Sequence, residues 1–281
     1  MRQIPGLVVD DARVYDAIVA AKHQPRRGLL QAIRATVIAA YNDYADAAPE
    51  VADLPAVNLT ADQRKALVHA FVVETVPLAK LRGDLLDRVI AARCPFCGLS
   101  ESSTLDHYLP KELNPQFAVL AKNLVPCCPL CNTRKRDFIV DDATDVRLFL
   151  HPYFDEVPLT RFLQVIVTVS QDALGLTYRI TRPAGMTQLT CQHLRSHFRL
   201  LGLADRYRIM SLDHLRGRYK TLSRLYGPAE NAGRVSAGLA QEAEGYEDEY
   251  GVNHWRAVLY RALADDDEFC DGGFEAIKDI Q

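Results

Sequence analysis

The chain has 281 residues, of which 48% are hydrophobic and 25% are charged, and its formal net charge is −3. These values are ordinary for a globular protein with one large or two small domains and a buried core. The slight acidity excludes recognition of nucleic acid through overall positive charge, so any such role has to rest on a local basic patch.

Targeting signals and membrane spans are not expected. The first residues carry charges too early for a signal peptide, and no stretch approaches the roughly 18 apolar residues of a membrane span. Four of the seven cysteines form Cys-x-x-Cys pairs. Without an export signal, that usage indicates reduced thiols and metal binding rather than disulfides. We therefore expect a cytoplasmic protein without a membrane partner.

Residues 1–92 are expected to form an N-terminal helical region. Apolar residues recur at helical spacing from Asp10 to about Ala47, with a break at Pro25. The two prolines between 48 and 59 indicate a loop.

A capping box, Thr60 to Gln63, predicts the start of the next helix. Pro77 is expected to kink or break that helix. A further helix over 78–92 then leads directly to the first cysteine pair.

Residues 141–281 are expected to form an α-rich region that contains a β-hairpin. Two runs rich in β-branched residues, 162–170 and 175–181, flank a short turn. The remaining segments with a helical pattern are 190–203, 204–226, a run ending near 250, and 253–266. The predicted fold class is mostly α with small β-hairpins (α+β).

Between these regions, residues 93–140 carry the chemistry. Cys94 and Cys97 form one Cys-x-x-Cys pair, and Cys128 and Cys131 form another. Four thiolates at this spacing suit tetrahedral Zn²⁺ in a closed structural site. Cys127 is an adjacent candidate, but Cys128 has the required spacing to Cys131. The gap between the pairs is longer than in a simple zinc ribbon, so the insert must have structure of its own.

The insert contains a carboxylate, an imidazole and two amides: Asp106, His107, Asn123 and Asn132. Carboxylate and amide oxygens suit Mg²⁺ or Mn²⁺ more than zinc. A neutral imidazole is a suitable general base for water. Because adjacent residues on a strand point to opposite faces, a twist or bulge is needed if Asp106 and His107 are to serve one site.

This stretch closely resembles the HNH endonuclease family. The resemblance lies in the first cysteine pair, then Leu105-Asp106-His107, then Asn123-Leu124-Val125-Pro126, and last the second cysteine pair with Asn132 directly after Cys131. The resemblance covers about 45 residues. It implies a ββα-metal fold, in which a hairpin and a helix hold one catalytic cation, here inside a helical shell. Many members have a histidine at the last motif position, where this chain has Asn132.

The resemblance also implies a role for each residue. Asp106 and Asn132 would be ligands of the catalytic Mg²⁺ or Mn²⁺, and His107 would be the general base. Asn123 would pin the loop and orient the histidine.

Basic residues near these positions are expected to bind the DNA backbone. Phosphate contacts of this kind give affinity without sequence preference. A solvated helix face is the alternative interpretation of the same residues. The candidates are Lys111, Lys122, Arg134, Lys135 and Arg136.

The leading hypothesis is a metal-dependent DNA endonuclease stabilised by zinc. The helical flanks loosely resemble the HNH subunits of bacterial anti-phage defence systems, the Septu type and retron-linked relatives, which work with an ATPase. Two alternatives stay open: a zinc-containing nucleic-acid- or protein-binding adaptor, and a nuclease that is active only with an ATPase or regulatory partner.

Overall fold

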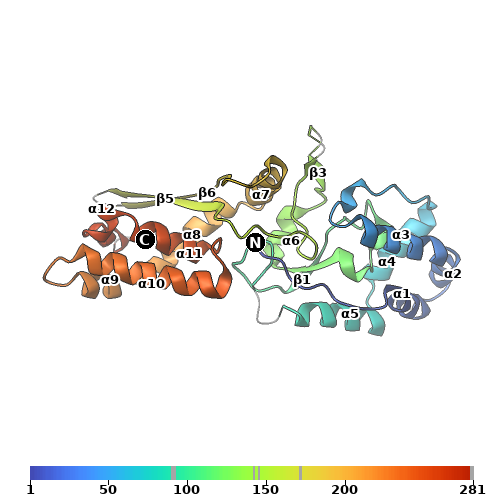
Figure 1. Ribbon diagram of the computed structural model, residues 1–281. Coiled ribbons are helices and arrows are strands. Elements are labelled where there is room, and N and C mark those ends of the chain that lie inside the picture. Colours follow the sequence, from blue (N-terminus) through green and yellow to red (C-terminus); the bar gives the residue numbers. More distant parts are fainter. Residues whose placement is uncertain (90–92, 142, 145, 171–172, 279–281) are drawn as a thin grey trace. The chain divides into compact units, whose positions relative to one another are not determined.

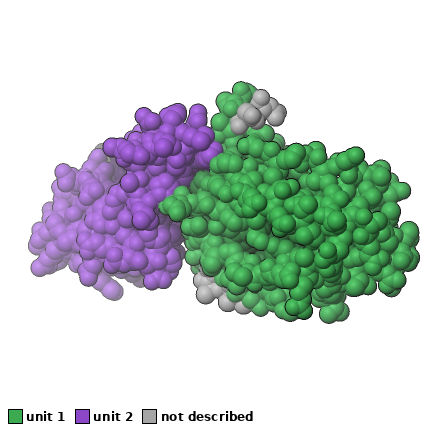
Figure 2. Space-filling view, turned by 45° about the vertical axis from the view of Figure 1, so that its right-hand side comes forward, with its two compact units in different colours: residues 1–157 green, residues 158–281 purple. Residues whose placement is uncertain are grey.

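The computed structural model describes residues 1–89, 93–141, 143–144, 146–170 and 173–278. The chain divides into two compact units, Met1–Val157 and Pro158–Gln281 (Figure 2). Residues 93–140, which carry the cysteine pairs and the candidate site, lie wholly within unit 1.

Unit 1 begins with a group of helices (Figure 1). The Asp10 side chain caps the first helix by accepting from Arg13 N, and Thr60 with Gln63 forms the predicted capping box. Tyr15, Leu30 and Tyr44 are among the side chains that these helices bury. The helices are α1 (Asp11–Ala20), α2 (Arg26–Ala32), α3 (Arg34–Ala47), α4 (Ala61–Val72) and α5 (Val76–Asp87), with a 3-10 turn η1 (Val51–Asp53) after α3.

Pro77 does not interrupt a helix. The helix α4 already ends at Val72, and Pro77 lies in the first turn of α5. Proline is tolerated there because the N–H groups of the first turn have no partner within the helix. The predicted break is therefore present, but it precedes the proline. The last residues of the helix predicted over 78–92, residues 90–92, lie outside the described residues.

A small hairpin and a helix follow. Strand β1 (Thr104–His107) pairs antiparallel with β2 (Leu124–Cys127), in a register that runs without a bulge from Thr104 opposite Cys127 to His107 opposite Leu124. The segment after β2 forms α6 (Pro129–Lys135), which packs on β1. Two 3-10 turns, η2 (Pro115–Phe117) and η3 (Ala121–Asn123), connect the two strands, and a two-residue pair, β3 (Val140–Asp141) and β4 (Val146–Arg147), follows the helix.

The segment 147–157 packs back on this hairpin. Tyr153 donates to Leu124 O on β2, at 2.6 Å, and Tyr108 donates to Phe149 O, at 2.7 Å. Arg147 is only 3% exposed and pairs with Glu50 and Asp155. These contacts explain why the first unit extends to Val157.

Unit 2 is built on a second hairpin. Strand β5 (Leu163–Ser170) pairs antiparallel with β6 (Ala173–Ile180), and their alternate residues are buried on one face. Helices α11 and α8 cover that face, α11 against β5 and α8 against β6 (Figure 1). The helices of this unit are α7 (Gln188–Leu200), α8 (Leu203–Arg216), α9 (Tyr219–Tyr226), α10 (Ala232–Tyr250), α11 (Trp255–Ala264) and α12 (Asp267–Cys270), followed by a 3-10 turn η4 (Gly273–Ile277).

The sequence prediction for unit 2 is confirmed in its main points. The hairpin is present, although residues 171–172 of its turn lie outside the described residues. The run predicted as one helix over 204–226 is two helices, because α8 ends at Arg216, before Gly217, and α9 begins at Tyr219. Glycine is a poor helix residue, and a break there costs little.

The chain is thus mostly α with small two-stranded antiparallel sheets, as predicted. Within the described residues, every helix is too short or too polar to cross a bilayer.

Replacing Arg147 with Met should lower the free energy of unfolding by about 3–5 kcal/mol, because the carboxylate of Asp155 then stays largely buried without a cation. Urea denaturation would measure the loss. The matched control is Arg34→Met, which breaks an ion pair with Asp16 in which both side chains are nearly half exposed. It should cost at most about 1 kcal/mol. Equal losses in the two variants would contradict this account of Arg147.

Candidate functional site

The two Cys-x-x-Cys pairs meet in one buried group. The sulfur atoms of Cys94, Cys97, Cys128 and Cys131 all lie within 4.8 Å of one another. The first pair lies in a tight turn, in which Gly98 N donates to Cys94 O at 2.7 Å and Gly98 has a φ of +68°. Few residues other than glycine adopt this conformation readily.

The second pair starts α6. Cys128 is the N-cap, and its sulfur accepts from Cys131 N at 3.4 Å. Cys127 is not part of the group: its thiol lies 3.5 Å from Thr104 Oγ1, and burial raises its pKa well above the ordinary value. The preference for Cys128 over Cys127 is confirmed. Four converging buried thiols can hold a structural metal such as zinc.

The hairpin and α6 carry the other candidates. Asp106 and His107 end β1, Asn123 immediately precedes β2, and Asn132 lies on α6. The absence of a bulge in this register means that Asp106 and His107 contact different elements. Asp106 faces α6 through Lys135, whereas His107 contacts Phe71 of α4.

Asp106 is 4% exposed, and the cation beside it, Lys135, is 1% exposed. Lys135 Nζ lies 3.0 Å from Asp106 Oδ2 and donates to the carbonyl oxygens of His107 and Tyr108, both at 2.9 Å. The approach of the ammonium to Oδ2 is not aligned as a hydrogen bond, so this carboxylate oxygen has no hydrogen-bond partner. Burial raises the pKa of Asp106, and Lys135 opposes that shift. A buried carboxylate oxygen that accepts no hydrogen bond is a suitable ligand for a hard cation.

His107 is held in one tautomer. Its Nε2 lies 2.9 Å from Ala118 O, and because a carbonyl only accepts, Nε2 must carry the hydrogen. Nδ1 then keeps the lone pair. Burial, with smaller contributions from Lys111 and Lys135, lowers the pKa of His107 to about 3, against the opposing bond to Ala118. At neutral pH, the imidazole is therefore uncharged, and Nδ1 carries the lone pair.

An aromatic ring covers this histidine. The Phe71 ring centroid lies 4.3 Å from that of His107, at an interplanar angle of 74°. Arg82 lies over the Phe71 ring at 4.5 Å and donates to Phe71 O at 2.7 Å. His107 is 8% exposed in consequence.

Asn123 pins the loop that follows β1. Its Oδ1 accepts from Leu109 N at 2.8 Å, and its Nδ2 donates to Leu109 O at 3.0 Å and to Phe117 O at 3.2 Å. The residue is fully buried. This loop also supplies Ala118 O, the partner of His107, so Asn123 supports the histidine indirectly.

A buried pair, Tyr44 and His151, braces Asn123 from behind and was not identified from the sequence. Tyr44 OH lies 3.2 Å from Asn123 Oδ1 and 3.0 Å from His151 Nε2. Because His151 Nδ1 accepts from Tyr153 N, Nε2 carries the hydrogen and donates to Tyr44. Tyr44 lies 79 residues before Asn123 and 107 residues before His151, so no local sequence motif could predict this contact.

Asn132 lies beside β1. Its Nδ2 is 3.3 Å from Thr104 Oγ1 and 3.4 Å from Leu105 O, and its amide oxygen takes no part in these contacts. The half-buried amide therefore has a free oxygen on the same helix that carries Lys135.

The five basic candidates differ in their surroundings. Lys135 is only 1% exposed and does not reach the surface, so we do not assign it to a phosphate contact. Lys122 pairs with Asp11, and Lys111 pairs with Glu112 at 3.2 Å. Arg134 and Arg136, at the end of α6, are exposed.

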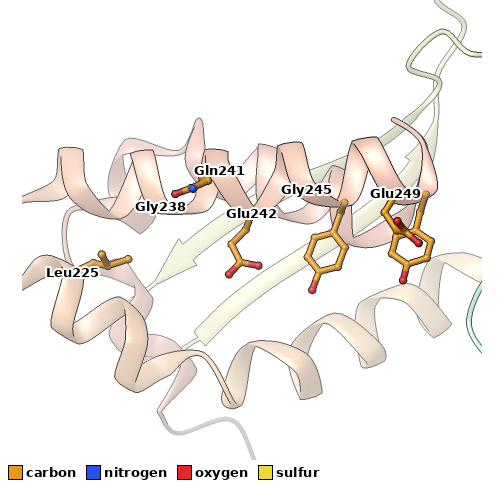
Figure 3. A pocket seen from close by; sticks show the side chains of 8 residues that line it. Leu225, Gly238, Gln241, Glu242, Gly245 and Glu249 are labelled. Atoms are coloured by element: carbon orange, nitrogen blue, oxygen red, sulfur yellow. The ribbon is translucent and has the colours of Figure 1, made fainter.

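A separate groove of about 630 Å³ lies in unit 2 along α10 (Figure 3). Glu242, Glu249, Tyr246 and Tyr250 line it, and Glu242 pairs with Arg218. Its lining is acidic and aromatic and contains none of the candidate residues. The groove does not suit a phosphate backbone.

One curated protein resembles this chain. It is Protein ea31 of Escherichia phage lambda, which is 29% identical over 197 residues. The match covers 64% of this chain and 64% of the phage protein, so it spans less than two thirds of that relative. No family model and no solved structure matches the chain. The name of this relative states no activity.

Replacing Cys94 with Ser should remove the bound metal and unfold residues 93–101 locally, because three thiolates leave a structural site incomplete. Metal content per chain and protease sensitivity would measure both effects. Cys127→Ser is the matched control and should keep its metal, since that thiol lies outside the group. Loss of metal from both variants would contradict this assignment.

His151 should make stability depend on pH. Burial and the nearby charges of Arg147 and Lys135 hold the pKa of His151 well below 6.5. The unfolded chain therefore binds more protons in acid, and stability is fully present above about pH 6.5 and falls below it by up to about 1.4 kcal/mol per pH unit. His151→Gln should reduce this slope in urea denaturation at several pH values. An unchanged slope would exclude His151 as its source.

Proposed function

We propose that the chain is an HNH-type endonuclease that hydrolyses DNA phosphodiester bonds. The observation that carries the proposal is the hairpin–helix unit β1–β2–α6, in which Asp106 and His107 end β1 and Asn132 of α6 lies beside the same strand. Asp106 contacts α6 and His107 contacts α4, so the proposal requires both sides of β1 to serve one site. Asn123 pins the adjoining loop, and the Cys₄ group lies at the start of the same helix. The order of these residues along the chain and the hairpin followed by a helix support the proposal.

His107 is the proposed general base. The bond from Nε2 to Ala118 O orients the ring and leaves Nδ1 to accept a proton from water. Asn123 is a positioning residue in this scheme, because it holds the loop that supplies Ala118.

The donor set fits a hard divalent cation. Asp106 has a buried oxygen that lies beside Lys135 but accepts no hydrogen bond, and Asn132 has an amide oxygen that the contacts to β1 do not use. These residues would hold Mg²⁺ or Mn²⁺, which supplies positive charge to stabilise the phosphate in the transition state. The Cys₄ group would hold zinc in a structural role, because a segment this small cannot form a core alone.

The exposed cations Arg134 and Arg136 follow Asn132 on the same helix, and Lys111 follows β1. We assign them to the phosphate backbone. The net charge of −3 limits the affinity that such contacts can give the chain alone.

The cover over His107 supports a second candidate, a nuclease that acts only with a partner. Phe71 lies against the imidazole, and neither Asp106 nor His107 is more than slightly exposed. In this proposal a scissile phosphate reaches His107 only if the end of α4 moves. An ATPase or regulatory subunit that moves it would suit an effector of anti-phage defence. An adaptor without catalysis is the remaining alternative.

Cleavage of supercoiled plasmid with Mg²⁺ or Mn²⁺ tests the proposal. Wild type should give nicked or linear product, and His107→Ala should lower the rate by at least about 100-fold, the usual range for loss of a general base. His23→Ala, which changes an exposed histidine in the same unit, is the control. Unchanged zinc content and thermal stability would exclude misfolding.

The variant Phe71→Ala separates the two enzyme candidates. If the ring only covers the site, this change should raise cleavage above wild type, or reveal it where wild type alone is silent. Plasmid that stays intact with wild type and Phe71→Ala, while both proteins bind DNA, would favour the adaptor.

A further inference from the structure

In unit 2, one edge of the β5–β6 hairpin has no neighbouring strand. The sheet has two strands, and within the described residues β5 pairs only with β6 (Figure 1). An open edge presents backbone N–H and C=O groups at every second residue.

The hydrogen bonds show which residues point outward. Thr181 N donates to Phe162 O at 2.8 Å, so Phe162 belongs to a pair that bonds toward β6. Counting along the antiparallel register, the N–H and C=O groups of Leu163, Val165, Val167 and Val169 point to the open edge.

One of these outward groups is already used. Leu163 N donates to Asn253 Oδ1 at 3.1 Å. Among the described residues, the outward groups of Val165, Val167 and Val169 receive no bond. The unused edge is therefore centred on Val167.

This edge lacks the usual protection. Natural edge strands are guarded by charged side chains, proline, bulges or short length. Strand β5 has eight residues, LQVIVTVS, with no charge and no proline, and its pairing with β6 has no bulge. Ile166 on its outer face is 41% exposed. Such an edge is suited to pairing with another strand.

A groove of about 470 Å³ runs beside the same edge. Five consecutive residues of β5, 163–167, line it together with Ala262 and other residues of α11. Three arginines, Arg161, Arg179 and Arg261, and two aspartates, Asp265 and Asp266, also line it. Arg161 and Arg261 both pair with Glu247, at 2.8 Å and 3.3 Å, so the cations and anions are matched in number. The chemistry of the groove therefore fits an extended segment without net charge.

We propose that β5 of a second copy of the chain occupies this edge. The described chain itself exposes an uncharged, β-branched strand with an open edge, namely β5. Antiparallel pairing about a two-fold axis places Val167 opposite Val167 of the second copy and Val165 opposite its Val169. Each facing pair exchanges two hydrogen bonds, and the two hairpins form one continuous sheet.

In this register, the outward N–H and C=O groups of Val165, Val167 and Val169 all form hydrogen bonds to the second copy. The bond from Leu163 N to Asn253 Oδ1 is kept. On the outer face, Ile166 lies opposite Thr168 of the second copy, so no like charges meet. A single added strand buries less than the roughly 800 Å² per partner of a standard interface, so the dimer should dissociate on dilution.

Sedimentation velocity of the full chain over a range of concentrations tests the proposal. Wild type should shift from monomer to dimer as concentration rises. Val167→Pro should remain monomeric, because proline removes an outward N–H while the β5–β6 ladder does not use that group. The matched control Val167→Ala keeps the N–H and should still dimerise.

Paired charge variants keep the test valid if the proline variant misfolds. Ile166 and Thr168 are both exposed, so two lysines or two glutamates there should not disturb the fold. Ile166→Lys/Thr168→Lys alone should be monomeric, since lysines then face lysines. Mixing it with Ile166→Glu/Thr168→Glu should restore a heterodimer.

Hydrogen exchange places the interface. The amides of Val165, Val167 and Val169 should gain protection as concentration rises, and amides at other surfaces should not. A chain that stays monomeric at every concentration, a dimer that survives in both Val167→Pro and the lysine variant, or a dimer without added protection at these three amides would each overturn the proposal.

Discussion

The buried ammonium group of Lys135 joins the parts of the candidate site. A charge at 1% exposure has to be matched by acceptors, and the available ones are the carbonyls of His107 and Tyr108 and the carboxylate of Asp106. The end of β1 is thereby tied to the last turn of α6. The rings of Tyr108 and Phe149 lie within 6 Å of the ammonium and complete its surroundings.

This arrangement also explains the electrostatics of the neighbouring groups. Lys135 opposes the rise in the pKa of Asp106 that burial causes, and it adds to the lowering of the pKa of His107. Lys135 thus favours the carboxylate form of Asp106 against the effect of burial, and it favours the neutral form of His107. These are the protonation states that a cation ligand and a proton acceptor require.

Local patterns predicted much of the fold and of the site. The capping box at Thr60, the β-branched runs of the second hairpin and the Cys-x-x-Cys spacing depend on residues close in sequence, and all three appear as expected. Contacts between residues far apart in the sequence could not be predicted in this way. A basic residue next to a motif resembles a phosphate contact, and only the packing of α6 on β1 shows that Lys135 turns inward. Likewise, Tyr44 and Asn123 are 79 residues apart, and no periodicity connects them.

The segment 93–140 carries every residue of the HNH resemblance, yet its folding depends on chain outside it. Tyr44 from α3 braces Asn123, Tyr108 donates to Phe149, and Tyr153 donates to β2. Recombination that transferred only the motif-bearing segment to another protein would leave these buried polar groups without partners. We therefore expect residues 93–140 and the parts of residues 1–157 that contact them to have been inherited together.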